Sequence, residues 1–563
     1  MALLEPADWA VLGFYLVAIV GFGVYMGRGN RRVEDFFLAG RQMPWWAIGL
    51  SVMATQISAI TFVGTTGQAF SKGMSFLVVY FGLPFAMVIL CVTLVPFFYR
   101  AGVYTAYQYL EKRFDGRTRT LTSLLFLISR GLSVGVTLYA PSLVLSVVLG
   151  WSEPATILLM GSTTIAYVVY GGNKSVIWTD VVQMVLIWVG VFVCLGVAIT
   201  KLPPAFGLRD SLALAQTAGR LAIVDTSLDP TKPYTLWSGL IGGFFLALAY
   251  FGTDQSQVQR YLSGKSLRES RLSLLFNAFL KIPMQFLILL TGVLVFVFYH
   301  FHPQPLLWNP SDQRALEVQA PAGALAPIES RFVAAEGRRR AAAEAFGAAR
   351  HDESRAEAAR LEYLAAGAAV EEARAEAHAL IKTIRKESRY DDTNYVFPTY
   401  VLSTLRGGLA GLILAVIFAA AMSTLSGELS ALATASMVDF YQRLGKGQRD
   451  EKHDLLVSRL LTAGWGVFAG VVALQAGRLG SAIEVVNKFG SYFYGSILGV
   501  FGLAILAPKA DGRGAFWGLL AGIATVAVVA QTTNVAFLWY NPIGAVTVFV
   551  VGRLLSARST NGR

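Results

Sequence analysis

The chain has 563 residues, of which 55% are hydrophobic and only 15% are charged, and its net charge is +12. Soluble domains carry about 25% charged residues, so this composition disfavours a soluble enzyme and favours a protein that lies mostly in lipid. The two cysteines, Cys91 and Cys194, both lie in apolar runs and do not form a disulfide framework. The basic residues fall between apolar runs, which indicates membrane topology rather than nucleic-acid binding.

Apolar runs of about 20 residues are long enough to cross the hydrocarbon core of a membrane. Thirteen are predicted, at 9–27, 45–70, 76–98, 121–149, 154–170, 178–200, 236–254, 272–299, 407–441, 455–476, 482–507, 514–532 and 535–555. Lysine and arginine are concentrated in the loops that follow the first, third, seventh and ninth runs. The positive-inside rule therefore places this multi-pass chain in the cell membrane with its N-terminus outside and its C-terminus in the cytoplasm.

One charged segment, 311–395, interrupts the series after the eighth run and is expected outside the membrane. It holds 13 basic and 15 acidic residues, and its middle is rich in the helix-forming residues alanine, glutamate and arginine. We expect a helical hairpin that projects from the membrane. A solvated, partly disordered insertion is the alternative. No catalytic signature occurs in this segment.

Two runs contain polar groups at a depth where lipid cannot hydrate them. Run 45–70 has hydroxyls, an amide and glycines between positions 54 and 64, and run 236–254 begins with glycines and ends in polar residues. Irregular backbone at this depth must be buried in protein or line a cavity, so both runs are predicted to break near the midplane. Two broken helices five runs apart are typical of an inverted repeat with its ligand site at the breaks. Helix packing through small residues is the alternative for the glycines alone.

Run 407–441 carries hydroxyls on one helix face, because Ala420, Ser423 and Thr424 are spaced at i, i+3 and i+4. Together with carbonyls freed by a helix break, these hydroxyls would offer neutral oxygens that suit a hard monovalent cation. Serine and threonine also commonly bond back to the i−4 carbonyl, and the spacing alone leaves both interpretations open.

Several charged residues lie within the runs. They are Arg130, Asp180, Lys281, Glu428 and Lys488. Charges inside a membrane are costly and mark a pathway or ligand site by default. The alternative is snorkelling or internal pairing, in which Asp180 or Glu428 binds Arg130 or Lys281.

Four stretches resemble the sodium:solute symporter family, which includes carriers of sugars, monocarboxylates, proline and sialic acid. They are 33–41 (VEDFFLAGR), 176–180 (VIWTD), 253–261 (TDQSQVQRY) and 421–426 (AMSTLS) running on to Asp439. The resemblance covers nearly the whole chain except 311–395. It implies an all-α polytopic membrane protein of the LeuT-type fold. The parts would be an extra N-terminal span (1–30), the first inverted repeat (31–200), the start of the second (201–310), the extracytoplasmic hairpin (311–395), the rest of the second repeat (396–510) and two C-terminal spans (511–563).

The resemblance also implies sodium as the coupling ion. Its main site would use the backbone carbonyls of Ala54, Ile57 and Ala420 and the hydroxyls of Ser423 and Thr424. Some members have a second sodium site, to which Asp180, Ser423 and Ser426 correspond. Gly427 stands where that site needs a further hydroxyl, and Glu428 follows it directly.

The substrate-binding residues implied by the resemblance are Ser58, Thr61, Arg130, Tyr250, Lys281 and Asn487. Arg130 with Ser58 and Thr61 resembles the sialic acid carriers, where an arginine binds the substrate carboxylate through two hydrogen bonds. Tyr250 matches a tyrosine that closes the sugar carriers' site from inside, and Lys281 and Asn487 match sugar contacts. Ala247 replaces a sugar-contacting asparagine, and 139–141 (YAP) resembles the monocarboxylate and vitamin branch.

These features predict a sodium-coupled importer of a small organic anion, a sugar acid or a monocarboxylate, that works by alternating access and is not an enzyme. A carrier of a neutral sugar or polyol is the alternative within the class, with Lys281 as a hydroxyl donor and Arg130 structural. A receptor or docking protein that uses the outer hairpin is the alternative of another class. The expected partners are sodium, a small solute and the bilayer, without nucleic acid or an obligate protein partner.

Overall fold

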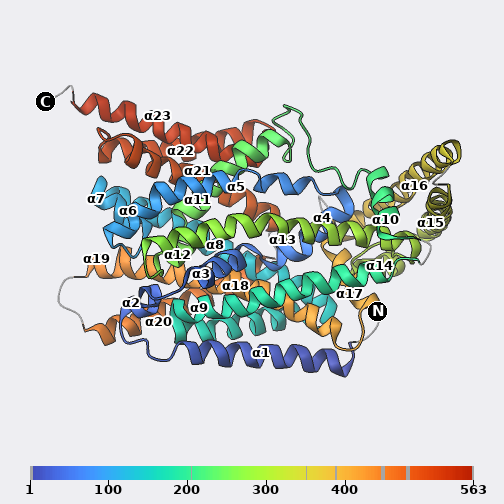
Figure 1. Cartoon of the computed structure of the whole chain (residues 1–563), viewed down its shortest axis with the longest axis horizontal. Helices are drawn as coiled ribbons and strands as arrows, with labels where there is room; N and C mark the ends of the chain where they lie inside the picture. Colours follow the sequence, from blue (N-terminus) through green and yellow to red (C-terminus); the bar gives the residue numbers. More distant parts are fainter. Residues whose placement is uncertain are drawn as a thin grey trace.

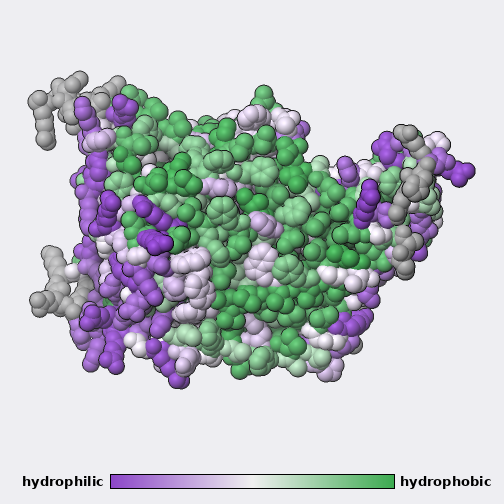
Figure 2. Space-filling view, viewed as in Figure 1, coloured by the Kyte–Doolittle hydropathy of each residue, from purple (hydrophilic) through white to green (hydrophobic). Residues whose placement is uncertain are grey.

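The structure, a computed structural model, describes residues 4–203, 206–349, 352–386, 390–445, 450–476 and 482–560. Within these ranges the regular structure is helical, and extended backbone pairs only in an isolated bridge between Met43 and Gly264. Most long helices run roughly parallel to one axis, and the two termini lie at opposite ends of the molecule (Figure 1). A broad apolar belt separates two polar ends (Figure 2), as expected for a protein that crosses a bilayer.

The bundle is formed by the long helices together with the shorter α5 (Leu83–Val92) and α6 (Leu94–Ala101), which follow one another in one apolar span. The long helices are α1 (Pro6–Met26), α8 (Gly116–Leu149), α9 (Glu153–Thr200), α13 (Leu267–Phe301), α18 (Leu409–Ala435), α20 (Glu451–Ala476), α21 (Ala482–Leu506), α22 (Gly512–Thr532) and α23 (Tyr540–Thr560). Shorter elements extend or connect these helices. They are α2 (Val33–Leu38), η1 (Ala39–Arg41), η3 (Ser75–Tyr80), α7 (Ala106–Arg113), α10 (Leu208–Thr217), η6 (Ser436–Tyr441), α19 (Gln442–Leu444) and η8 (Phe537–Trp539).

The number of spans depends on how broken helices are counted. In the described residues nine helices are long and apolar enough to cross a membrane, or ten when a bent pair counts as one. The 48 residues of α9 are interrupted at Gly172, whose φ is 57°. At 1.5 Å per residue this helix is roughly 70 Å long, enough for two crossings. Counting α9 twice and adding the shorter apolar helices Ser238–Thr253 and Gly490–Leu506 gives the thirteen runs that the sequence predicts.

Two helices are interrupted inside the bundle. In the first, α3 (Trp45–Gln56) ends before a non-helical residue, Ile57, and the chain continues through η2 (Ile60–Gly64) and α4 (Thr65–Lys72) at an angle of 63°. The break predicted within 45–70 is therefore confirmed. In the second, the chain passes from η4 (Ser238–Gly242) into α11 (Gly243–Thr253), is extended at Asp254, and resumes as α12 (Gln255–Leu262). This second break lies at the polar end of run 236–254, not at its glycines.

Segment 311–395 contains α14 (Pro310–Gln319), α15 (Leu325–Ala348), α16 (Glu353–Arg385) and η5 (Thr393–Tyr395), followed by α17 (Val396–Thr404). Helices α15 and α16 pair and project from one end of the molecule (Figure 1). Their seam contains Ile328, Phe332, Ala335, Val370, Ala373, Ala377 and Ile381. Tyr363 connects the pair to the bundle, because its hydroxyl and Nε2 of His300 on α13 share a 2.9 Å hydrogen bond.

Small residues hold α1 against α9. Ser175 Oγ donates a 2.7 Å hydrogen bond to the carbonyl of Gly23, and a Cβ added at Gly27 would overlap the Cα of Gly171. The two backbones approach this closely because neither Gly27 nor Gly171 has a side chain. Close approach through small residues is a main source of helix association in lipid, where the hydrophobic effect between helices is absent.

We therefore predict that Gly27→Val lowers the thermal unfolding temperature of the detergent-purified protein. The added side chain must push α1 away from α9, and overpacking of this kind costs about 1–3 kcal/mol. Gly21→Val is the matched control, because it lies on the same helix and a Cβ there meets no atom within 4 Å. An equal effect of both substitutions would contradict the proposed contact.

Candidate cation and solute site

The first helix break lies against α18, where the predicted sodium residues meet. Thr424 Oγ1 donates hydrogen bonds to the carbonyls of Thr55, at 3.1 Å, and Ala420, at 3.2 Å. Ser423 Oγ is buried, lies beside the Asp180 carboxylate and makes no hydrogen bond of normal geometry. At the break itself, the carbonyl of Ala54 accepts a 3.1 Å hydrogen bond from the amide of Ile57.

This set of atoms fits a sodium ion. The hydroxyls and carbonyls are neutral oxygen ligands, which hard cations prefer. A buried hydroxyl that makes no hydrogen bond of normal geometry, such as that of Ser423, is better satisfied when it also binds a ligand. The structure thus brings together the break at 54–57, at the end of α3, and the face of α18 at 420–424. These two segments are far apart in the sequence.

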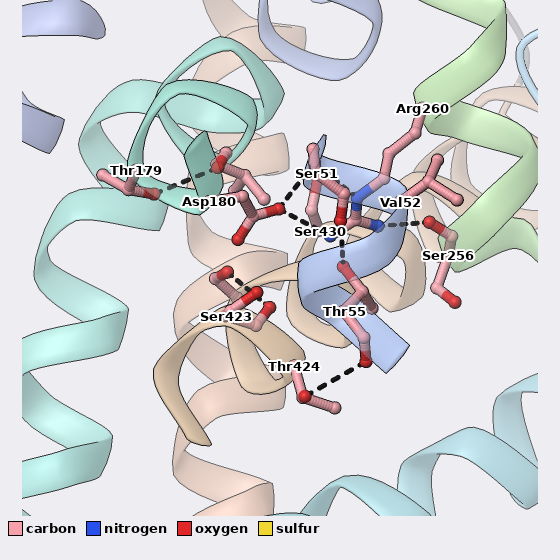
Figure 3. Close-up of polar contacts among 12 residues, drawn as sticks. Ser51, Val52, Thr55, Thr179, Asp180, Ser256, Arg260, Ser423, Thr424 and Ser430 are labelled. Carbon is pink, nitrogen blue, oxygen red and sulfur yellow. Dashed lines mark hydrogen bonds and ion pairs between the residues drawn. The ribbon is translucent and has the colours of Figure 1, made fainter. Parts of the chain in front are cut away.

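A second cluster of charges lies directly beside these hydroxyls (Figure 3). Oδ2 of Asp180, on α9, accepts hydrogen bonds from Ser51 Oγ at 2.6 Å and from Nη2 of Arg260 at 3.2 Å. Nε of Arg260 donates to the same serine oxygen at 2.8 Å, and Nη1 donates to the carbonyl of Ser256. Arg260 is 1% exposed, so its charge is neutralised by Asp180 inside the protein.

The Arg260 guanidinium occupies the space beside Gly427. A Cβ added at Gly427 would overlap Nη2 of Arg260, so a serine cannot be accommodated there without displacing the guanidinium. Ser426 Oγ is directed to its own helix, where it donates a 2.9 Å hydrogen bond to the carbonyl of Ser423. The residues present therefore do not fit a second sodium, because one hydroxyl is missing and Asp180 is already paired with a cation.

Arg130, on α8, lies between two carboxylates. Its Nε and Nη2 donate to Oδ2 of Asp254 at 2.7 and 2.5 Å, and its Nη1 donates to Oε1 of Glu428 at 2.8 Å. The rings of Tyr250 and Tyr494 lie 5.3 and 5.4 Å from its Cζ. Pairing of Arg130 with Glu428 is one of the alternatives left open by the sequence. Asp254 was not predicted as a partner, although it stands in the stretch 253–261 and at the polar end of its run.

Among the other predicted solute residues, the ring of Tyr250 faces Arg130, and the rest of those whose side chains are described contact other groups. Ser58 and Thr61 are at the first break, with 3.2 Å between their hydroxyl oxygens. Tyr250 OH accepts a 2.9 Å hydrogen bond from Gln257. Lys281 is 1% exposed, and its ammonium lies 5.1 Å from the ring of Tyr80 without a hydrogen-bond partner among the described residues. The predicted contact Asn487 lies outside the residues whose side chains are described.

Comparison with known proteins identifies the family of this chain. Residues 36–310 and 373–522 match the model of the sodium:solute symporter family. The chain belongs to this family. It is 27% identical over 560 residues to the sodium/sialic acid symporter NanT of Aliivibrio fischeri, covering 98% of this chain and 94% of the relative. It is also 27% identical over 519 residues to the human sodium-coupled monocarboxylate transporter 2, covering 92% of this chain and 71% of the relative.

Among solved structures, a Na⁺-coupled sialic acid symporter in a substrate-bound outward-open state matches with a TM-score of 0.78. The sequence identity is 25%, and the match covers 98% of each chain. The predicted all-α, LeuT-type fold is confirmed. The chain is a sodium-coupled, multi-pass membrane transporter of a small solute, and not an enzyme.

The contact between Gly427 and Arg260 predicts the effect of a single methyl group. Gly427→Ala should lower the unfolding temperature, because the added Cβ displaces the guanidinium and leaves Asp180 as a buried charge with a weakened partner. Gly464→Ala is the control, since a Cβ there, in α20, meets nothing within 4 Å and alanine favours a helix. Thermal unfolding in detergent measures both variants. A Gly427→Ala protein as stable as the wild type would show that Arg260 does not occupy this space.

Proposed function

We propose that this chain imports a small carboxylate solute together with one sodium ion, by alternating access. The observation that carries the sodium part is the buried Ser423 hydroxyl on α18, which makes no hydrogen bond of normal geometry and stands next to Thr424, which contacts the first helix break. The carboxylate part is supported by the relatives that transport sialic acid or monocarboxylates and by Arg130, beside the second break. Positive charge in alternate loops supports an orientation with the N-terminus and the α15–α16 pair outside.

Sodium would act by joining elements of the two repeats. An ion bound to the carbonyls of the α3 break and to the hydroxyls of Ser423 and Thr424 holds α3 against α18. It thereby favours the conformation in which both broken helices border the solute site. Linkage requires that the solute in turn raises the affinity for sodium by the same factor.

A single sodium per cycle follows from Arg260. The guanidinium supplies, inside the protein, the positive charge that Asp180 would otherwise obtain from a second ion. The number of buried basic side chains in the site equals the number of buried acidic ones, so the site has zero net formal charge before one sodium ion and one carboxylate enter it. The basic residues are Arg130, Arg260 and Lys281, and the acidic residues are Asp180, Asp254 and Glu428. Uptake of a monocarboxylate would then move no net charge.

A neutral sugar or polyol is the second candidate solute, and one observation favours it. The donors of Arg130 already bind two carboxylates, whereas the ammonium of Lys281 has no hydrogen-bond partner in the described residues. Under this alternative Arg130 is structural and Lys281 donates to a solute hydroxyl.

The sodium site predicts which variants lose coupling. Wild-type protein should be stabilised against heat by a carboxylate probe, N-acetylneuraminate or lactate, in sodium and not in potassium, because binding stabilises the folded state. The double variant Ser423→Ala/Thr424→Ala should lose this sodium-dependent shift and sodium-driven uptake into proteoliposomes. The matched control is Ser162→Ala/Thr163→Ala, whose hydroxyls bond only to carbonyls of their own helix α9. Glucose as the sole stabilising probe would favour the neutral-solute alternative, and uptake without a sodium requirement would refute the proposal.

Binding of a single sodium ion predicts the stoichiometry of transport. Initial uptake rates plotted against sodium concentration should give a Hill coefficient near 1, and labelled sodium and labelled monocarboxylate should enter in equal amounts, since Arg260 fills the second cation position. No transport current should accompany uptake of a monocarboxylate. A Hill coefficient near 2 with inward positive current would show that a second sodium binds despite Arg260.

A further inference from the structure

We propose that Glu428 is an internal competitor for the solute carboxylate. Its carboxylate binds the Nη1 donor of Arg130, and a carboxylate solute takes this donor by displacing Glu428. Glu428 would thereby set the affinity and the preference for acids over neutral solutes. This inference rests on the proposed function, in which Arg130 recognises a carboxylate.

The two carboxylates on Arg130 are held unequally. Asp254 accepts two hydrogen bonds from Arg130 through Oδ2, and its Oδ1 accepts from the amide of Ser256 at 2.9 Å and from its hydroxyl at 2.7 Å. Asp254 is thus fixed to the backbone at the start of α12. Glu428 accepts one hydrogen bond from Arg130 through Oε1, while its Oε2 is buried and makes no hydrogen bond of normal geometry. Glu428 is therefore the partner that costs less to displace.

The surroundings of Arg130 restrict where a new partner can bind. The rings of Tyr250 and Tyr494 lie 5.3 and 5.4 Å from its Cζ and only 6.1 Å from each other, so both lie on one side of the guanidinium. Asp254 accepts hydrogen bonds from Nε and Nη2, and Glu428 accepts one from Nη1. A guanidinium has five N–H groups, so the donors left for a solute are on Nη1 and Nη2, next to the donor that Glu428 uses. A solute carboxylate that leaves Asp254 and the start of α12 in place therefore binds at this edge, where it meets Glu428.

The solute carboxylate and Glu428 cannot both bind Arg130 at this position, because both are negatively charged. Arg130, Asp254 and Glu428 are 7%, 2% and 3% exposed, and together they carry one negative charge. A third carboxylate would add another negative charge to a buried group, where each uncompensated charge costs several kcal/mol. Thr137, on the same helix as Arg130, already interacts with the Glu428 carboxylate, so its hydroxyl can keep this carboxylate in place when a solute takes the Arg130 donor.

The test is Glu428→Gln, which keeps the shape of the side chain and removes its charge. The Kd for the carboxylate probe that stabilises the wild-type protein, measured by thermal shift in sodium, should fall about tenfold or more, the equivalent of one charged hydrogen bond. The Kd for a neutral solute and the sodium dependence should not change. Weaker or unchanged binding of the acid would overturn the proposal.

Two further variants keep the inference testable. Asp254→Asn removes the firmly held partner, so it should lower the unfolding temperature without tightening acid binding selectively. Glu428→Asp keeps the charge but is one methylene shorter, and it should still bind the acid more tightly than the wild type if Glu428→Gln does not fold. Equal tightening by Asp254→Asn and Glu428→Gln would refute the special role of Glu428. Absence of any sodium-dependent acid binding in the wild type would instead refute the proposed function.

Discussion

The carboxylates and guanidiniums buried in the centre of the bundle are paired with one another, and the architecture of the central region depends on this pairing. A single unpaired charge at this depth costs several kcal/mol, so each carboxylate and each guanidinium dictates what lies next to it. Asp180 holds α9 to α12 through Arg260, and Arg130 holds α8 to α12 and α18 through Asp254 and Glu428. The helices that carry the proposed cation and solute residues are connected by these pairs.

The same pairs explain why helix breaks are tolerated. Asp254 is extended between α11 and α12, and its carboxylate binds the Ser256 amide at the start of α12 as well as Arg130. At the first break, Thr424 donates to the carbonyl of Thr55, and the bundle buries the interrupted backbone. Polar backbone groups without helical partners are thereby satisfied by side chains from other helices, which lipid could not do. These polar groups are also those that a cation and a solute can use.

Gly427 illustrates how one small residue connects packing with ion coupling. Its missing side chain leaves room for the Arg260 guanidinium, which pairs with Asp180. The protein thus has a permanent positive charge at a position where the family pattern implies an exchangeable one. Glu428, the next residue, turns toward Arg130. Two consecutive positions of α18 therefore contact two different arginines, and α18 connects the proposed cation site with the proposed solute site.

The sequence alone determined the class of protein, the membrane runs, the first helix break and the hydroxyl face at Ala420, Ser423 and Thr424. The membrane runs, the break and the hydroxyl face follow from local hydropathy and helical spacing, which residues close in the sequence decide, and the class of protein follows from short motifs that resemble the family. Only the tertiary structure decided the partner of each buried charge. Arg130 is separated from Asp254 by 124 positions and from Glu428 by 298, and no local pattern chooses between Glu428 and Asp180 as its partner. The obstruction of Gly427 by Arg260 is likewise a contact between distant segments. Such contacts depend on how whole helices pack, because the side chain that fills a given space can come from any part of the chain.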